Sequence, residues 1–229
     1  MLARSIQRRF GFLILALVLG SGGCGLTDYE ARLEVQEKRL KYMEEENKNL
    51  NDRPVNLADR VTEEGGVKYK QFFLRVPLGV SHNPEEKGEG KFDVYKPLKP
   101  DSGFQKILLA VENDDDVEKF KTAVVAALLK APATPTVKSI PRPLDKPQAY
   151  DFYQKDGVQL YIPQNSYYRV AIAFFPSGSA NQTLVDERIK YSLASFADGR
   201  KAEAQRRVSR AQSTKKEAPD KGGPKKKTP

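Results

Sequence analysis

The sequence predicts an α+β protein. An N-terminal signal and a coiled-coil helix precede an antiparallel sheet packed with about two helices, and a disordered basic tail follows. Three observations support this prediction. A heptad pattern follows a short apolar run near the N-terminus. Short β-branched and aromatic runs in the centre are bounded by turn residues. Two segments among them repeat apolar residues at helical spacing, as helices packed on a sheet do.

Composition and charge limit the classes of protein. The 229 residues are 39% hydrophobic and 30% charged, with one Cys, one His and no Trp. These counts exclude a disulfide-stapled scaffold, a multi-cysteine zinc module and a polytopic membrane protein. The formal net charge of +9 comes from the two ends, because residues 24–198 together carry −2. The body between the ends is therefore expected to be nearly neutral.

Residues 1–23 have the three parts of a secretory signal. Three arginines precede an apolar run of ten residues, Phe10–Leu19, and small residues lead from that run to Cys24. The run is short for a membrane-spanning helix, which needs about 20 apolar residues. We therefore expect this segment to act in targeting and not to join the fold.

The signal and the single Cys that follows it resemble those of bacterial lipoproteins. In that family a signal peptidase cuts just before the Cys, the thiol receives a diacylglycerol, and the new amine is acylated. The resemblance implies that Cys24 is the lipidated first residue of the mature chain. It also implies a cell-envelope protein anchored to the inner or outer membrane and facing the periplasm. The alternatives are an ordinary cleaved signal and a short uncleaved anchor.

Residues 24–50 predict a lipid-anchored coiled-coil stalk. With Leu26 at position a, six of the eight a and d positions are apolar or aromatic. Asn at an a position is a residue type that fixes the register of a coil. The predicted seam consists of Leu26, Tyr29, Leu33, Leu40, Met43, Asn47 and Leu50.

The residues beside the seam predict how copies of the stalk pair. In a parallel coil, Arg32 of one chain faces Glu37 of the other, and Arg39 faces Glu44. Both pairs have opposite charges, and a lipid anchor would hold every copy in the same direction. We expect a parallel homo-oligomer, either a dimer or a trimer. The alternative is a single solvated helix.

A linker is expected at residues 51–66 and a globular α+β domain at residues 67–198. A polar loop is expected at residues 81–90, and an extended excursion with five prolines at residues 131–149. Lys155-Asp156-Gly157 predicts the turn of a hairpin. The expected strands are Val67–Val76, Lys91–Tyr95, Phe104–Val111, Tyr150–Gln154, Val158–Ile162 and Tyr167–Phe175.

Two helices are expected in the domain. Asp115 and Glu118 form a capping-box pattern at the start of the first helix, and Pro132 lies just beyond its end. Thr183 is the expected cap of the second helix, and Gly199 is expected to close it. The expected buried faces are Val117, Phe120, Val124, Leu128 and Leu129 for the first, and Leu184, Val185, Ile189, Leu193 and Phe196 for the second.

The order of elements resembles the Mog1/PsbP-like fold, which includes small bacterial lipoproteins. The resemblance is carried by the Phe73–Pro77 segment, the central hairpin and the Ile189–Phe196 segment. It implies an antiparallel sheet opened by an apolar-Pro strand and closed by a helix. It implies no functional residue, because a fold of this kind is compatible with many functions.

The chain carries few residues that suggest chemistry. His82 is expected to be a solvated loop residue, and the acidic run Glu112–Asp116 to be a capped helix start, with a weak Ca²⁺ site as the alternative. No catalytic residue, metal site or cofactor is predicted. One aromatic group is expected in the core, and the alternative is an exposed patch for a glycan or partner. It comprises Tyr150, Phe152, Tyr153, Tyr161, Tyr167, Tyr168, Phe174 and Phe175.

The basic low-complexity tail spans residues 199–229, with a net charge of +8 and no expected packed structure. Export makes nucleic acid an implausible partner. An anionic envelope polymer or lipid headgroups are the expected partners, and a solubilising role is the alternative. The residues predicted to bind such a surface are Lys215, Lys216, Lys225, Lys226 and Lys227.

These observations together predict a non-enzymatic cell-envelope lipoprotein. Its stalk oligomerises the chain and presents an interaction domain to an envelope partner. The alternative is an accessory ligand- or glycan-binding subunit of an envelope complex. A third possibility is a hydrolase with an unrecognised Ser/Asp site, although no nucleophile–base pair is visible.

Overall fold

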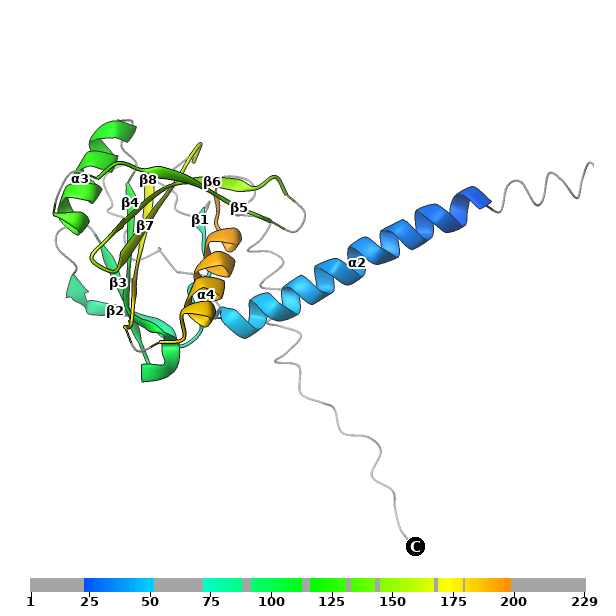
Figure 1. Cartoon of the computed structure of the whole chain (residues 1–229), viewed down its shortest axis with the longest axis horizontal. Coiled ribbons are helices and arrows are strands. Elements are labelled where there is room, and N and C mark those ends of the chain that lie inside the picture. Colours follow the sequence, from blue (N-terminus) through cyan, green and yellow to red (C-terminus); the bar gives the residue numbers. More distant parts are fainter. Residues whose placement is uncertain are drawn as a thin grey trace, which may run out of the picture. The chain divides into compact units, whose positions relative to one another are not determined.

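A computed structural model describes residues 23–51, 72–87, 92–112, 116–130, 133–142, 145–166, 169–178 and 180–198. These residues form an α+β structure with an antiparallel sheet, as predicted (Figure 1). They contain three α-helices, and the sheet has seven strands. The chain divides into two compact units, one ending at Glu45 and the other beginning at Glu46. The elements are α2 (Gly23–Asn49), β1 (Phe72–Phe73), β2 (Val80–Lys87), β3 (Asp93–Pro97), the 3-10 helix η3 (Pro100–Ser102), β4 (Phe104–Glu112), α3 (Val117–Leu129), β5 (Thr136–Ile140), β6 (Gln148–Lys155), β7 (Val158–Pro163), β8 (Arg169–Pro176), α4 (Gln182–Ser195) and β9 (Ala197–Asp198).

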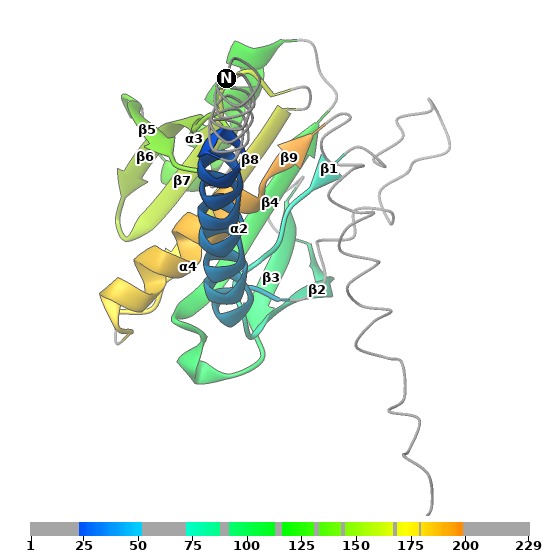
Figure 2. The ribbon, with the colours of Figure 1, turned by 90° about the vertical axis from the view of Figure 1, so that its right-hand side faces the viewer.

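The main sheet has the strand order β2-β3-β4-β8-β7-β6-β5, and all its neighbouring strands are antiparallel. Side chains alternate between its two faces, so β4 sends Ile107 and Leu109 to one core and Leu108 and Ala110 to another. Helix α4 packs in the first core and α3 in the second. The two helices therefore cover opposite faces of the sheet (Figure 1). A second, two-stranded sheet pairs β1 with β9, which Figure 2 shows side by side.

The strands with strong apolar patterns lie where the sequence predicts them. β4 and β8 are buried neighbours in the middle of the sheet, and the hairpin of β6 and β7 is also confirmed. Asp156 and Gly157 both have positive φ angles, 49° and 79°, which is the backbone of a two-residue type I′ turn. The aromatic residues on these strands fill the cores. Tyr150 is fully buried, and its hydroxyl donates to the Leu193 carbonyl of α4 at 2.7 Å.

Two edge strands were not predicted. The expected loop at residues 81–90 is wrong over its described part, because β2 runs through it as an edge strand. Pro84 is tolerated there because an edge strand pairs on one side only. β5 lies inside the expected excursion, at the opposite edge of the sheet. Pro135 and Pro141 flank β5 directly, which is a common way to limit an exposed edge.

Both helices of the domain form as predicted, but their caps differ. The carboxylate of Asp116, and not that of Asp115, caps α3 by accepting from the Lys119 N–H at 3.0 Å. Asp115 itself lies outside the described residues. The side chain of Asn181, and not that of Thr183, caps α4 by accepting from the N–H groups of Thr183 and Leu184. In both places adjacent residues could serve as caps, and the local backbone selects one.

The buried face of α3 and the end of α4 also differ from prediction. On α3, Val125 is buried, whereas the expected Val117 and Leu128 are only half-buried. Helix α4 ends at Ser195, where the chain turns into β9 to pair with β1. The expected closing residue Gly199 lies outside the described part of the chain.

Within the described part of the expected strand Val67–Val76, the strand is shorter than predicted and comprises only Phe72–Phe73. Serines of α4 form hydrogen bonds with the backbone of Arg75, which follows this strand in the chain. The Arg75 N–H donates to Ser195 Oγ at 2.9 Å, and Ser192 Oγ donates to the Arg75 carbonyl at 2.8 Å. Both groups are buried, so these side-chain bonds replace those of a neighbouring strand.

The last turn of α2 belongs to the folded unit. The Arg75 guanidinium donates to the Asn51 carbonyl at 2.9 Å and to Asn47 Oδ1 at 3.0 Å, and it lies 3.5 Å from Glu46 Oε1. Leu50 is fully buried and forms an antiparallel bridge with Pro77. The predicted boundary between a stalk ending at residue 50 and a linker from residue 51 is therefore corrected, since the folded unit already begins at Glu46.

We expect that Arg75→Met destabilises the folded unit by about 3 kcal/mol, because it leaves the Glu46 carboxylate without its partner. Burial raises the pKa of Glu46, and the charge of Arg75 opposes that rise. Urea unfolding followed by circular dichroism measures the change in free energy. Lys119→Met, at an exposed position on α3, is the matched control. Equal stabilities of the two variants would contradict this role of Arg75.

Candidate functional site

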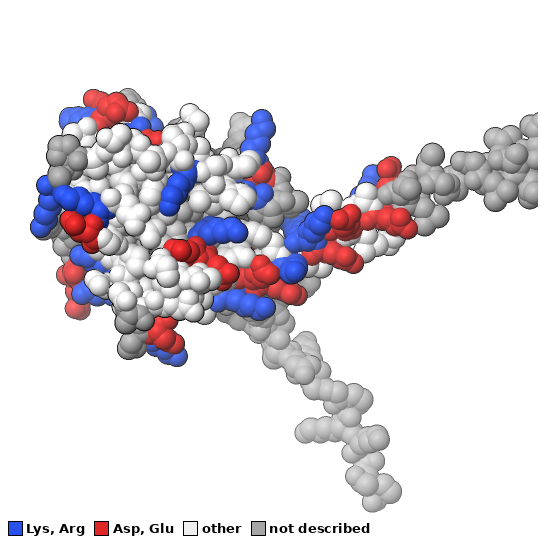
Figure 3. Space-filling view, viewed as in Figure 1, with Lys and Arg blue, Asp and Glu red and all other residues white. Residues whose placement is uncertain are grey.

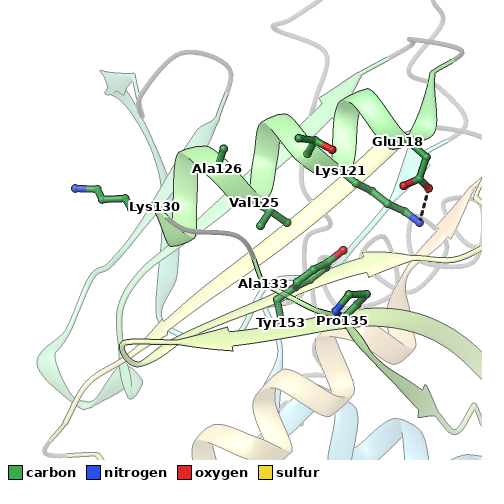
Figure 4. A pocket seen from close by; sticks show the side chains of 9 residues that line it. Glu118, Lys121, Val125, Ala126, Lys130, Ala133, Pro135 and Tyr153 are labelled. Atoms are coloured by element: carbon green, nitrogen blue, oxygen red, sulfur yellow. Dashed lines mark hydrogen bonds and ion pairs between the residues drawn. The ribbon is translucent and has the colours of Figure 1, made fainter.

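A hollow of about 700 Å³ lies beside α3, and we call it the α3 groove (Figure 4). Its volume falls within the range of about 300–1,000 Å³ that is usual for small-molecule sites. One wall is α3, and the other is the segment that leads into β5. The lining residues are Glu118, Lys121, Thr122, Val125, Ala126, Lys130, Ala133, Pro135 and Tyr153.

The groove exists because α3 covers only part of its face of the sheet. The helix packs against β7 and β8, which leaves Tyr153 of β6 to line the hollow. Figure 4 shows Tyr153 and Pro135 across the hollow from α3, with Lys130 pointing away from it. The nearest part of α3 contributes the apolar side chains of Val125 and Ala126. The groove thus combines an apolar lining with charged groups at one end.

An ion pair between the half-buried Lys121 and the buried Asp151 lies at that charged end. The Lys121 ammonium is 2.7 Å from Asp151 Oδ2 and 3.3 Å from Glu118 Oε1. The Gln164 side-chain amide donates to Asp151 Oδ1 at 2.5 Å. Asp151 is only 6% exposed, so its carboxylate needs these partners to remain charged. The network joins α3 to β6 and to the residues that follow β7.

The pKa values of these groups respond to the same contacts. Burial opposes ionisation of Asp151, but hydrogen bonds from Lys121 and Gln164 and the charge of Lys121 outweigh it and lower its pKa. The hydrogen bond to Asp151 raises the pKa of Lys121, against the effect of burial. Burial, with the nearby Asp151 charge, raises the pKa of Tyr153. The pair is therefore ionised at neutral pH and the phenol is neutral.

A second hollow of about 390 Å³ also has Lys121 in its lining. It is more polar than the α3 groove, because Asp151, Gln164, Ser166 and Arg169 contribute to it. The Lys121 side chain thus borders an apolar hollow and a polar one. This arrangement suits a ligand with an apolar part and a polar or charged part. Asp151 is held by Lys121 and Gln164.

Sequence reasoning missed this site, although two signals were present. Asp151 is a carboxylate in a strand of aromatic residues, where alternation places it on the same face as Tyr153. Lys121 directly follows Phe120 on the apolar side of α3. An acid and a base that each border an apolar stripe can pair across it. Their partnership depends on long-range packing, because 30 residues separate them.

The predicted seam residues fall into two groups. Tyr29, Leu33 and Leu40 are 63%, 40% and 60% exposed on α2. Met43 also lies on α2, and Cys24 and Leu26 lie near its N-terminal end. Leu50 is fully buried in the folded unit, so its assignment to the seam is corrected. Asn47 is exposed, and its side-chain oxygen accepts a hydrogen bond from Arg75. The predicted surface-binding residues Lys215, Lys216, Lys225, Lys226 and Lys227 lie outside the described residues.

The other candidate residues that the structure describes lie on strands, in the core or at a helix cap. His82 lies on β2 and not in a loop, with Nε2 3.8 Å from Asp93 Oδ1 and its ring beside Tyr95. Of the acidic run, residues 113–115 lie outside the described part. The exposed aromatic patch is wrong for the described aromatic residues, since Phe175 is half-buried and the others are buried. The buried ones are Tyr150, Phe152, Tyr153, Tyr161 and Phe174.

Within the described residues, no group of three or more His, Cys, Asp or Glu side chains is placed to hold a metal ion. No helix in the same residues has the length and apolar character to cross a membrane. No protein-family model matches the chain, and no curated protein matches it either. Function is therefore inferred from the chain's own residues.

We expect Asp151→Asn to reduce stability by about 2 kcal/mol near neutral pH, because a charged hydrogen-bond acceptor is lost. The lowered pKa of Asp151 means that its contribution is present above the ordinary carboxyl value of 3.8 and is lost as pH falls below it. Unfolding curves from about pH 7 to about pH 2 should therefore converge for the variant and the native chain. Glu187→Gln, exposed on α4, is the control. A stability difference that does not depend on pH would contradict the ion pair.

Proposed function

We propose that this chain is a non-enzymatic, lipid-anchored protein of the cell envelope. Helix α2 associates with other copies, and the folded unit is an interaction module. The observation that carries the proposal is the exposure of Tyr29, Leu33 and Leu40 on α2. Large apolar side chains spaced by four and seven residues favour burial against another helix. Val35 is also exposed but lies outside this stripe.

The charges on α2 support a second copy of the same helix as the partner. Arg32, Glu37, Arg39 and Glu44 are all exposed, so each is available for pairing. In a parallel assembly each Arg meets a Glu of the other copy, and an antiparallel assembly has no such match at these positions. Acidic and basic side chains are interspersed along α2 in Figure 3. Complementary flanks around an apolar stripe are what a homomeric coil requires.

The anchor is proposed at Cys24. The signal-like segment before it and its place at the start of α2 support this position. Three acyl chains would hold the protein firmly, because each buried CH₂ contributes about 0.8 kcal/mol and two chains already give stable attachment. The proposed location is the inner or outer membrane, with the protein facing the periplasm.

The α3 groove is the proposed binding site of the folded unit. Its apolar lining and the charged Lys121 at one end support an amphipathic ligand or a partner side chain of that kind. Acidic and basic side chains are interspersed over the visible face of this unit, so no large charged patch competes for the role there (Figure 3). Binding of the basic tail to an anionic envelope polymer and the Mog1/PsbP-like resemblance stay predictions.

Replacement of the cysteine tests the anchor. We expect the native chain to be cut before Cys24, to carry the mass of acyl chains and to sediment with membranes. Cys24→Ser should lose all three properties, because the thiol that accepts the first lipid is gone. Intact-mass spectrometry and membrane fractionation measure them, with Ser21→Ala as a variant of the same segment that keeps the Cys. Native protein that is cut elsewhere and soluble would remove the anchor from the proposal.

Charge reversal tests the parallel pairing. Reversing both arginines in the double variant Arg32→Glu, Arg39→Glu should weaken association of membrane-bound copies, since like charges then face each other. Adding Glu37→Arg and Glu44→Arg should restore it. Chemical cross-linking in membranes measures association, and Lys38→Glu, on the face opposite the seam, is the control. Equal cross-linking of all variants would argue against a parallel coil.

A further inference from the structure

The folded unit shortens the apolar stripe of α2. Leu50 is fully buried in that unit, and Asn47 accepts a hydrogen bond from Arg75 there. Leu50 is therefore not available to a second helix while the unit is folded, and the side-chain oxygen of the exposed Asn47 is already bound to Arg75. The positions that remain span 18 residues, or about two and a half heptads. They are Leu26, Tyr29, Leu33, Gln36, Leu40 and Met43.

A seam of this length is weak by itself. Confident coiled coils sustain their pattern for at least about three to four heptads. One of the six remaining positions is Gln36, which contributes little apolar area. Asn47, whose residue type fixes the register at an a position, is engaged elsewhere. Association of free chains at micromolar concentration therefore has little to support it.

Tethering changes this balance. A membrane anchor at the N-terminal end of α2 would hold all copies parallel and confine them to one surface. Effective concentrations of tethered groups reach the millimolar range, about a thousandfold above a micromolar solution. The complementary charges of Arg32 with Glu37 and of Arg39 with Glu44 then meet in register. Weak contacts are sufficient under these conditions.

We propose that α2 pairs with a second copy of the chain only when the N-terminal end is tethered to a bilayer, and that the untethered chain is monomeric. This inference rests on the proposed function, since it takes the anchor to lie at Cys24. The inference adds a condition for assembly, which is that the N-terminal end of α2 is tethered to a bilayer. Because residues 46–51 are part of the folded unit, the remaining seam is too short to associate in solution. Assembly therefore occurs only after the chain has reached a membrane.

The single Cys allows a direct test. Cys24 is the only Cys of the chain, so a maleimide lipid couples the chain from residue 24 onward to vesicles at that position alone. This coupling replaces acylation, so the test does not depend on whether the cell lipidates the residue. The photoreactive substitution Leu33→p-benzoylphenylalanine reports contact at the seam. The matched control is Lys38→p-benzoylphenylalanine, because Lys38 lies on the opposite face and is paired with Glu34.

We expect cross-linked oligomers from the Leu33 variant on vesicles, at least about tenfold more than from the same protein free at equal concentration. The yield should fall as lipid dilutes the protein on the surface. The Lys38 variant should give little product in either state. Equal cross-linking in solution would overturn the requirement for a tether, and none on vesicles would overturn self-association. Equal yields from both positions on vesicles would mean crowding and not a seam. Failure of the anchor itself appears separately, in the mass of the native protein.

Discussion

The side chain and backbone of Arg75 connect three parts of the folded unit. Its N–H and carbonyl bind serines of α4, and its guanidinium binds Glu46, Asn47 and the Asn51 carbonyl. These bonds replace a strand partner for the segment and fix the last turn of α2. Leu50 can then be buried beside Pro77. Without Arg75 the Glu46 carboxylate would be buried beside no cation, which is a costly arrangement. The point at which α2 becomes part of the folded unit follows from this one residue.

The sheet explains where a ligand could bind. Its two faces are covered by different helices, and α3 covers β7 and β8 while leaving Tyr153 of β6 open to a hollow. The Lys121–Asp151 pair then holds α3 to the sheet at one end of that hollow. Because the Asp151 carboxylate is buried, loss of the half-buried Lys121 would be more costly than breaking a surface ion pair. The same contact therefore stabilises the fold and shapes the charged end of the α3 groove.

Apolar runs and turn residues predicted the central strands of the sheet correctly, because these signals lie within short stretches of sequence. β4, β8 and the β6–β7 hairpin combine apolar runs with clear turn residues. The edge strands β2 and β5 were missed because an edge strand tolerates proline and exposed polar residues. Leu50 fits a seam and a core equally well, so a heptad pattern cannot decide between them. The α3 groove was missed because Lys121 and Asp151 meet only through packing of distant elements. Caps shifted by one or two residues because neighbouring side chains could serve.

Amide hydrogen exchange on the untethered chain tests the central claim, which is that residues 46–51 belong to the folded unit and the preceding part of α2 does not. The N–H of Asn51 donates to the Val76 carbonyl, and that of Leu50 donates to the Glu46 carbonyl. We predict that these amides exchange as slowly as those of α4, since both open only when the unit unfolds. Amides between Tyr29 and Leu40 should exchange much faster. Uniform protection from Tyr29 to Leu50 would instead mean that α2 is already paired in solution, and fast exchange at Leu50 and Asn51 would mean that the last turn is not docked.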